Sequence, residues 1–415
     1  MQPAAEARLS AAGAGGHLPA EALDALKALD LDEEVDDLEW TLGADAEEAS
    51  ARESESGTVA VKTPGGGASP DSKRRFSLRR RRNSSKSKGP EPELKIRLVC
   101  TIGEKQGDTP GKLDTPNSMC AVPSLGRDPA PRLAIADTHN NRLQLVSSAT
   151  GRNPSILGPK LIAPKGVCYS PMDGTVFVVE FGSNRVTKLR LADGEPICNS
   201  GDAAQEEGAK ACRLKYPDGC ALVGDLLFVA DTEHHRLVAL HAADLKVAFE
   251  VGSKETKGAD PGCFHYPRGL ATWQDNHVVV ADSRNHRLQV LSRTGEHLKS
   301  IGRRLGQPEA DELFPTEPVG VAAARDILVA AEDEGKRIHC IGMPQGVPLQ
   351  VLKLDVRPRG LCAYVCGDGG FRVGIAAWKD HKVKLLDCQM EGFTDDSKGK
   401  ASAEEQAPQM VTHAL

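Results

Sequence analysis

Six short polar segments hold most of the side chains that could bind a ligand or carry out chemistry. Each segment follows an apolar run and precedes a basic residue that opens another apolar run. Histidine, amide, aromatic and basic side chains placed there could ligate a metal, donate hydrogen bonds or stack on a partner. Phe181 and Trp378 are the most informative, because a turn seldom requires an aromatic side chain. The candidate binding residues are His139, Asn140, Phe181, His234, His235, Arg284, His286, Lys336, Trp378, Lys379 and His381.

The residues that flank these segments are expected to be structural. An acidic or small residue ends the first apolar run, and a basic residue follows it at a constant offset of five positions. Asp and Asn in a tight turn bond nearby backbone N–H groups and tolerate left-handed conformations. We therefore expect each pair to fasten a strand to its turn. The pairs are Asp137 and Arg142, Glu180 and Arg185, Asp231 and Arg236, Asp282 and Arg287, Glu332 and Arg337, and Ala377 and Lys382.

The elements that position these segments recur along the chain. A Pro-x-Gly signal followed by apolar residues returns at spacings between 40 and 53 residues, and the recurring Gly is expected to supply a backbone angle or a close approach that a Cβ would block. Aromatic residues just before the signals are expected to pack between repeats rather than to stack on a ligand; they are Tyr216, Phe264, Tyr266 and Phe314. The signals start at Pro164, Pro217, Pro267, Pro318 and Pro358, with a degenerate copy at Pro116 that has Ser118 in the Gly position.

The pattern predicts an all-β fold, a β-propeller with six blades. Short aliphatic runs bounded by Gly, Pro, Asn and Asp are typical of strands, and about four of them per repeat of this length indicate a propeller blade. Helical periodicity is essentially missing from residues 95–390. The segment 96–103 has the pattern of a fourth strand, yet it precedes the first complete repeat. We predict that it joins the last blade, between about Gly360 and Leu386, and closes the ring without an open edge.

These residues resemble the NHL-repeat family, whose repeat couples a Pro-x-Gly strand start to a valine-rich strand, Asp, Asn and an Arg that opens the next strand. The resemblance covers roughly residues 95–390 and is strongest at Asp231–Arg236 and Asp282–Arg287. It implies a six-bladed propeller, in agreement with the six repeats. It also implies that the polar segments gather at the end that NHL domains commonly use to bind RNA or protein.

The resemblance leaves three function classes open. We favour a protein-binding scaffold that uses one face of the propeller, with an RNA-binding post-transcriptional regulator as the alternative. Residues 95–390 carry 37 basic and 35 acidic side chains, a net charge of +2. This balance lacks the global basic excess that phosphate neutralisation favours. The remote alternative is a metal-dependent propeller hydrolase or lyase, because some six-bladed relatives hold a divalent ion in the channel.

The enzyme hypothesis is not favoured. No nucleophile–base pair or Gly-rich phosphate loop stands out, so the chain is predicted not to be an enzyme, with no catalytic residue, metal or cofactor. In many relatives the propeller recognises substrates for a ubiquitin ligase that has RING, B-box and coiled-coil parts. No Cys-x-x-Cys pair is present here, so a ligase role would need a separate partner chain. Without a coiled coil, the chain is expected to be monomeric.

Cysteine usage and hydropathy indicate a reduced compartment. All 11 Cys lie between Cys100 and Cys388 in an odd number and at irregular spacing, with no secretory signal. This pattern favours reduced thiols in a cytoplasmic or nuclear protein. No window approaches the 18 consecutive apolar residues of a membrane span.

Residues 1–94 are predicted to form a disordered arm, and residues 391–415 a disordered tail. The acidic part of the arm, 1–70, carries 15 acidic and 4 basic side chains, a net charge of −11. Within it, residues 17–42 could form a short helix that resembles a leucine-rich nuclear export signal; the alternative is a transient helix without a partner. Whether the acidic stretch contacts the propeller is left open.

The second part of the arm, 71–94, is basic, with 9 basic and 3 acidic side chains and a net charge of +6. Ser77 and Ser84 each follow an arginine by three residues and resemble substrates of a basophilic kinase; Ser85 is a third candidate. Two phosphates would add about −3 to −4 charge. The run also resembles a nuclear localisation signal and could contact acidic lipid or RNA, whereas a solvated linker is the alternative. We favour a phospho-regulated element in a cytoplasmic protein that can shuttle to the nucleus.

Overall fold

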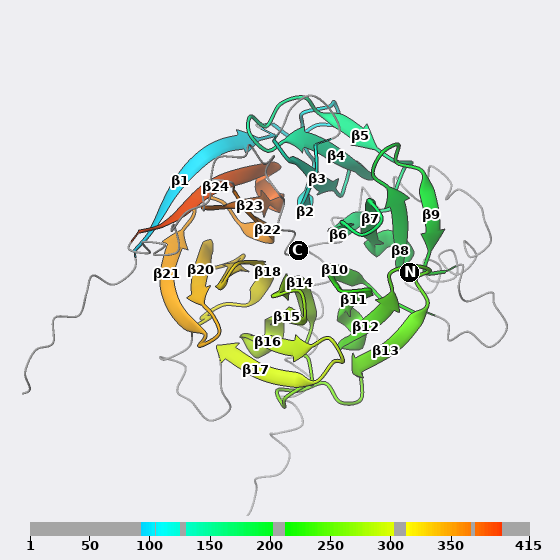
Figure 1. The fold of residues 1–415 in the computed structure, drawn as a ribbon, viewed down its shortest axis with the longest axis vertical. Coiled ribbons are helices and arrows are strands. Elements are labelled where there is room, and N and C mark those ends of the chain that lie inside the picture. Colours follow the sequence, from blue (N-terminus) through cyan, green and yellow to red (C-terminus); the bar gives the residue numbers. More distant parts are fainter. Residues whose placement is uncertain are drawn as a thin grey trace, which may run out of the picture. The chain divides into compact units, whose positions relative to one another are not determined.

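Residues 93–103, 105–124, 130–201, 212–302, 313–366 and 370–391 are described by the computed structural model. Within these ranges the strands form six four-stranded sheets, which surround a central channel like the blades of a propeller (Figure 1). The predicted all-β, six-bladed propeller is confirmed. No helix in the described ranges is long and apolar enough to cross a membrane. The predictions for residues 17–42 and for Ser77, Ser84 and Ser85 lie outside the described residues.

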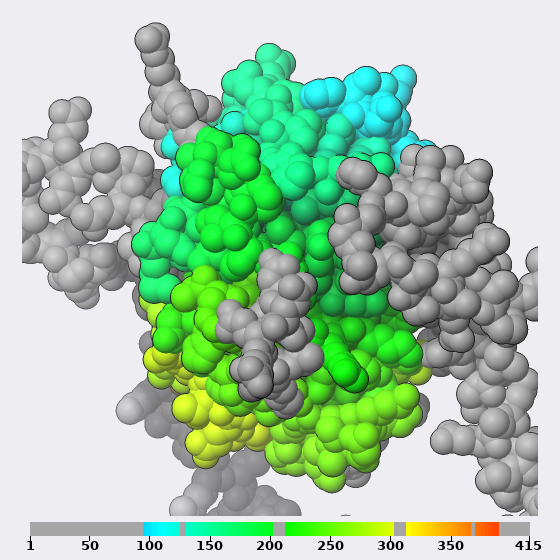
Figure 2. All heavy atoms as spheres, turned by 90° about the vertical axis from the view of Figure 1, so that its right-hand side faces the viewer, coloured from blue at the N-terminus to red at the C-terminus, as the bar shows by residue number. Residues whose placement is uncertain are grey.

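Each of the first three blades begins beside the channel and ends at the rim (Figure 1). Blade 1 contains β2 (Pro116–Val122), β3 (Arg132–Asp137), β4 (Arg142–Ser147) and β5 (Ser155–Leu157). Blade 2 contains β6 (Pro164–Ser170), β7 (Thr175–Glu180), β8 (Arg185–Arg190) and β9 (Pro196–Asn199). Blade 3 contains β10 (Pro217–Val223), β11 (Leu226–Asp231), β12 (Arg236–His241) and β13 (Val247–Gly252). Figure 2 shows blades 2 and 3 from the rim, in green.

Blades 4 and 5 repeat this order, and blade 6 departs from it. Blade 4 contains β14 (Pro267–Trp273), β15 (His277–Asp282), β16 (Arg287–Ser292) and β17 (His297–Gly302). Blade 5 contains β18 (Pro318–Ala324), β19 (Ile327–Glu332), β20 (Arg337–Gly342) and β21 (Val347–Lys353). Blade 6 takes its outer strand from the other end of the described chain and contains β22 (Pro358–Val365), β23 (Phe371–Ala377), β24 (Lys382–Glu391) and β1 (Glu93–Ile102).

Strand β1 closes the ring. It pairs antiparallel with β24 from Glu93 opposite Glu391 to Ile102 opposite Val383, with a register shift between Leu98 and Cys100. The prediction that the segment 96–103 joins the last blade is confirmed. The pairing covers an edge of β24 whose backbone groups would otherwise be open to another chain.

The glycines of the Pro-x-Gly signals let the inner strands converge on the channel. A Cβ added to Gly320 would lie 2.0 Å from the carbonyl oxygen of Arg359, and one added to Gly360 would lie 2.1 Å from that of Asn117. Neither glycine has a positive φ. Of the two roles expected for these glycines, close approach of the backbones is therefore the one that the fold requires.

The hydrophobic core lies between neighbouring blades. Six clusters of buried side chains each combine residues of two adjacent blades. Phe264 is fully buried between blades 3 and 4, and Phe314 is fully buried between blades 4 and 5. The expected inter-blade packing of these two residues is confirmed. Tyr216 and Tyr266 remain half-buried and lie at one end of the propeller.

Candidate functional site

The six polar segments are the turns between the second and third strands of the blades. Because antiparallel strands alternate in direction, these turns lie at the same end as the loops that lead into the inner strands. We call this end the turn face. Four of the turns contain a short 3₁₀ turn: η2 (Phe181–Ser183), η4 (Thr232–His234), η5 (Ser283–Asn285) and η7 (Trp378–Asp380).

Ion pairs to a buried carboxylate fasten five of these turns. In blade 1, Arg142 Nε lies 2.7 Å from Asp137 Oδ2, and in blade 4 Arg287 Nε lies 2.7 Å from Asp282 Oδ2. The equivalent pairs in blades 2, 3 and 5 span 2.6 to 2.8 Å, and all five carboxylate side chains are fully buried. The structural role expected for the flanking residues is confirmed in these five blades.

The same carboxylates also hold the loops that lead into the inner strands. In blade 4, Asp282 Oδ1 accepts the backbone N–H of His265 at 2.8 Å. Blade 6 has Ala377 in the carboxylate position, and there Asp380 Oδ2 accepts the N–H of Arg357 at 3.1 Å. Oxygens engaged by arginine and backbone donors are poorly placed to act as a general base or to ligate a metal.

The residue that ends each turn connects its blade to the next. His235 Nδ1 accepts the backbone N–H of Tyr266 at 3.3 Å, and His381 Nδ1 accepts that of Thr115 at 3.1 Å. Accepting this bond places the proton of the neutral His235 imidazole on Nε2, and His381 Nδ1 also lies 3.2 Å from Asp114 Oδ1. The residues at this position share a left-handed φ between 46° and 55°; they are Asn141, Asn184, His235, His286, Lys336 and His381.

Aromatic and cationic side chains stack in layers on the turn face. The rings of Phe181 and Tyr216 lie 5.0 Å apart between centroids, and Lys165 Nζ lies 3.7 Å from the Phe181 centroid. The guanidinium of Arg284 lies 4.2 Å from the centroid of Tyr266. Cation–π contacts of this kind stabilise by about 0.5–2 kcal/mol each. The three aromatic rings stay half-buried, so part of each is accessible to a partner.

Trp378 differs from the exposed aromatic side chain that the sequence suggested. It is only 6% exposed, and its Nε1 donates a hydrogen bond of 2.9 Å to Asp333 Oδ2 of the neighbouring blade. Its ring lies 4.8 Å from the Arg359 guanidinium and 4.9 Å from Lys379 Nζ. Trp378 therefore supports the turn face from below, and the exposed cation above it is Lys379.

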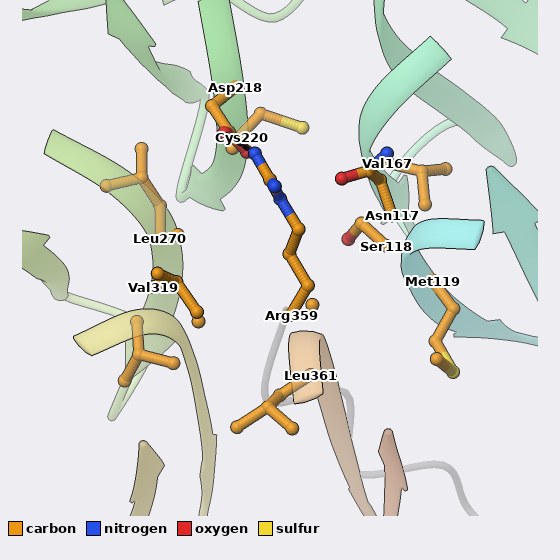
Figure 3. A pocket seen from close by; sticks show the side chains of 15 residues that line it. Asn117, Ser118, Met119, Val167, Asp218, Cys220, Leu270, Val319, Arg359 and Leu361 are labelled. Carbon is orange, nitrogen blue, oxygen red and sulfur yellow. Dashed lines mark ion pairs between the residues drawn. The ribbon is translucent and has the colours of Figure 1, made fainter. Parts of the chain in front are cut away.

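The middle residues of the Pro-x-Gly signals surround the mouth of the channel. Arg359, on β22, reaches across the channel toward Asp218 on β10, on the opposite side of the ring (Figure 3). Its Nη2 lies 3.7 Å from Asp218 Oδ2, and Arg268 Nη1 lies 3.9 Å from the same oxygen. Three cations and one carboxylate therefore share this ring, whose members are Asn117, Lys165, Asp218, Arg268, Val319 and Arg359.

A small cavity lies in the channel beside the Arg359 side chain (Figure 3). Its volume is about 30 Å³, which holds about two water molecules. Apolar side chains of the inner strands form much of its wall, among them Met119, Val167, Leu270 and Leu361. The channel at this level is therefore almost filled.

The predicted binding residues all lie on the turn face, but most are engaged within the protein. Asn140 donates to Gly107 O and to Asp137 Oδ2, and His234 Nδ1 lies 2.9 Å from Asp231 Oδ2. Hydrogen bonds also involve His139 with Thr115, and His286 with the carbonyl of Phe314. Lys336 and Lys379 are exposed. Their role in binding a partner stays a prediction, as it does for the remaining candidates, Phe181, His235, Arg284, Trp378 and His381.

The ring around the channel mouth was not predicted from the sequence. The Pro-x-Gly signal left its middle residue unassigned, although Lys165, Asp218, Arg268 and Arg359 are charged at this repeat position. A charged residue recurring beside a structural Pro and Gly was the available signal. Tyr216 packs between blades as expected, because its ring stacks on Phe181 of blade 2, but the contact lies at the surface of the turn face.

Two histidines make stability depend on pH. Burial lowers the pKa of His235 and of His265 to about 4. The unfolded state has a histidine pKa of about 6.5, so it binds more protons than the folded state between these values. Stability is therefore lost as the pH falls from about 6.5 toward 4. We expect the urea midpoint to decrease over this range and the decrease to be smaller in His265→Gln.

Tryptophan fluorescence during urea unfolding at several pH values would measure this effect. His241→Gln, at an exposed residue of β12, is the matched control and should keep the wild-type dependence. Identical slopes for His265→Gln and the wild type would contradict the assignment.

Residues 264–291 match the family model described as the NHL repeat. They contain β14, β15 and most of β16, whose turn has the Asp282–Arg287 pair, one of the two pairs nearest to the family pattern. With the six-bladed architecture, this match confirms the resemblance to NHL-repeat propellers.

Other similarities are more distant. The protein SUPPRESSOR OF QUENCHING 1, chloroplastic, from Arabidopsis thaliana is 21% identical over 270 residues, covering 54% of this chain and 25% of the plant protein. Thus the match spans about a quarter of that relative's length. A streptogramin B lyase structure has a TM-score of 0.46 at 13% identity, covering 71% of this chain and 98% of the other. A chain of a nidogen/laminin complex has a TM-score of 0.46 at 16% identity, covering 60% and 86%.

Proposed function

We propose that this NHL-repeat propeller is a protein-binding platform that uses its turn face. The propeller fold is compatible with such a role. The observation that carries the proposal is the pair of half-buried layers, Phe181 on Tyr216 and Tyr266 under Arg284. Tyrosine, tryptophan and arginine are the side chains most enriched at binding hot spots. Rigid aromatic rings held by neighbouring cations lose little conformational entropy on binding.

Binding is favoured over catalysis. The carboxylates of five turns are buried and occupied by arginine and backbone donors. The channel cavity of about 30 Å³ is far smaller than the roughly 300–1,000 Å³ of small-molecule sites. Both observations support a surface that recognises a macromolecule.

The cellular setting is part of the proposal. All eleven Cys are free thiols, which supports a reducing compartment such as the cytoplasm. We propose that phosphorylation of Ser77, Ser84 and Ser85 in the basic run controls location or access to the turn face. Replacing the three serines with alanine should then change the nuclear fraction of a tagged protein. An unchanged distribution in cells with active basophilic kinases would count against this part.

The test of the platform is a crosslinking capture from native cells, analysed separately for protein and RNA. Phe181→Ala and Tyr266→Ala should each lower recovery of the main protein partner at least about tenfold, the cost of removing a hot spot. Met172→Ala, at an exposed residue in the loop between β6 and β7 at the opposite end, is the control. Recovery of RNA at physiological salt, lost with the same variants, would favour the RNA-binding alternative because bases also stack on aromatic rings.

A further inference from the structure

We propose that the channel mouth is a carboxylate-binding site that takes a glutamate or aspartate side chain from an acidic peptide. This inference rests on the proposed function, because it assigns the chemistry of the partner segment that meets the turn face. It depends on Asp218 and on the two arginines near its Oδ2, Arg359 across the channel and Arg268.

The guanidinium of Arg359 is buried, and its positive charge is incompletely paired. Arg359 is 6% exposed, and among the described residues its Nε has no hydrogen-bond acceptor. Asp218 Oδ2 lies 3.7 Å from Arg359 and 3.9 Å from Arg268, beyond hydrogen-bond distance. Asp333 also attracts both guanidiniums, but its Oδ2 is engaged by Trp378 Nε1. A buried charge is costly unless it is paired and hydrogen-bonded. A further carboxylate would supply the missing acceptor.

The N–H groups of Arg359 have the geometry that fits a carboxylate. A guanidinium presents its N–H groups in a planar fork that matches the two oxygens of a carboxylate. The Nε edge of Arg359 is the part of that fork left without an acceptor. The Trp378 ring, 4.8 Å from the guanidinium, holds the group in place. The site is therefore preorganised for a planar anion.

The size of the cavity beside Arg359 also fits a carboxylate group. The cavity beside Arg359 holds about two water molecules, comparable to the two oxygens of a carboxylate. It is too small for a complete small-molecule ligand. The remainder of the ligand must then lie outside the channel, where Lys165 and Phe181 are stacked. A peptide with an acidic side chain between apolar neighbours fits both parts.

The experiment measures binding of a fluorescein-labelled ten-residue peptide of Glu, Leu and Gly to the full chain, with the Gln peptide as its neutral counterpart. We expect the Glu peptide to bind more tightly than the Gln peptide. Arg359→Gln should weaken the Glu peptide at least about tenfold, which is the loss of one charged hydrogen-bonded contact. Arg293→Gln, whose side chain pairs with Asp225 at the opposite end of the propeller, should leave the affinity unchanged.

Asp218→Asn separates a binding site from a structural ion pair. The amide has almost the same size but no charge, so the two arginines lose the charge of Asp218, within 4 Å of both, and should bind the Glu peptide several-fold more tightly. A misfolded variant cannot produce tighter binding. Weaker binding by both Asp218→Asn and Arg359→Gln would show that the pair is only structural and would overturn the proposal.

Three further outcomes would also decide whether the site exists. If the Glu peptide still binds to Arg359→Gln, it binds elsewhere on the chain, such as at the basic run 71–94, and the proposed site is wrong. Tighter binding of a ten-nucleotide single-stranded RNA, with the same dependence on Arg359, would assign the site to phosphate instead of carboxylate. If the Glu peptide does not bind, but capture of the protein partner is still lost in Phe181→Ala, the protein-binding platform is supported and the carboxylate site is not.

Discussion

Gly320→Ala is expected to destabilise the protein by about 3 kcal/mol, the upper range for forcing extra atoms into a packed interior. The added Cβ would lie 2.0 Å from the carbonyl oxygen of Arg359, a backbone atom that no side-chain rotation can move. Strands β18 and β22 would have to separate, which disturbs the convergence of all six inner strands. Urea unfolding followed by tryptophan fluorescence would measure the loss.

Gly258→Ala is the matched control for this substitution. Its added Cβ would have one neighbour at 4.0 Å, the carbonyl oxygen of Thr256, and Gly258 has no positive φ. We expect a change within about 0.5 kcal/mol, as for ordinary surface substitutions. A similar loss in both variants would mean that glycine acts at Gly320 through chain flexibility and not through the close approach.

Asp282→Ala should cost about 3–5 kcal/mol, because it leaves a buried arginine without its counterion. Asp282 is fully buried and accepts hydrogen bonds from Arg287 Nε at 2.7 Å and from the backbone N–H of His265 at 2.8 Å. The Arg287 side chain is itself only 6% exposed. Both the turn and the loop into β14 would lose their anchor. Thermal and urea unfolding would report the change.

Two controls accompany Asp282→Ala. Asp244 pairs at 3.5 Å with Lys246, and the two side chains are 48% and 39% exposed, so Asp244→Ala should cost at most about 0.5 kcal/mol. The double variant Asp282→Ala with Arg287→Met should recover part of the loss, since no unpaired charge remains. A double variant less stable than Asp282→Ala alone would show that hydrogen bonds of Arg287 to the loop matter more than the pair.

The fold could be predicted from the sequence because the propeller repeats one local pattern. Pro starts each inner strand, and the acidic residue and arginine five positions apart mark a tight turn; both signals depend on residues near each other in the chain. The position of strand β1 was also predictable, since Ile96 to Gly103 carried the pattern of a fourth strand and blade 6 lacked one.

The candidate site was less predictable because it joins residues from different blades. Arg359 and Asp218 belong to opposite blades, and the sequence contains no signal for an ion pair across the channel. The burial of Trp378 depends on Asp333 in the adjacent blade. Local turn chemistry suggested exposure for that ring, whereas packing between repeats decided otherwise. Histidines in the turns were read as surface groups for the same reason, although His235 and His381 connect blades.

The closure of blade 6 by β1 determines the order in which the molecule can be completed during synthesis. Arg97 of β1 bonds Asp387 of β24, 290 positions later. Blades 1 to 5 consist of consecutive strands and can form as they leave the ribosome, but β1 must wait unpaired until β24 emerges. Contacts between such distant residues form slowly, and an unpaired strand exposes the nascent chain to aggregation. Two molecules that meet at this stage could exchange β1, giving a strand-swapped dimer with every blade intact.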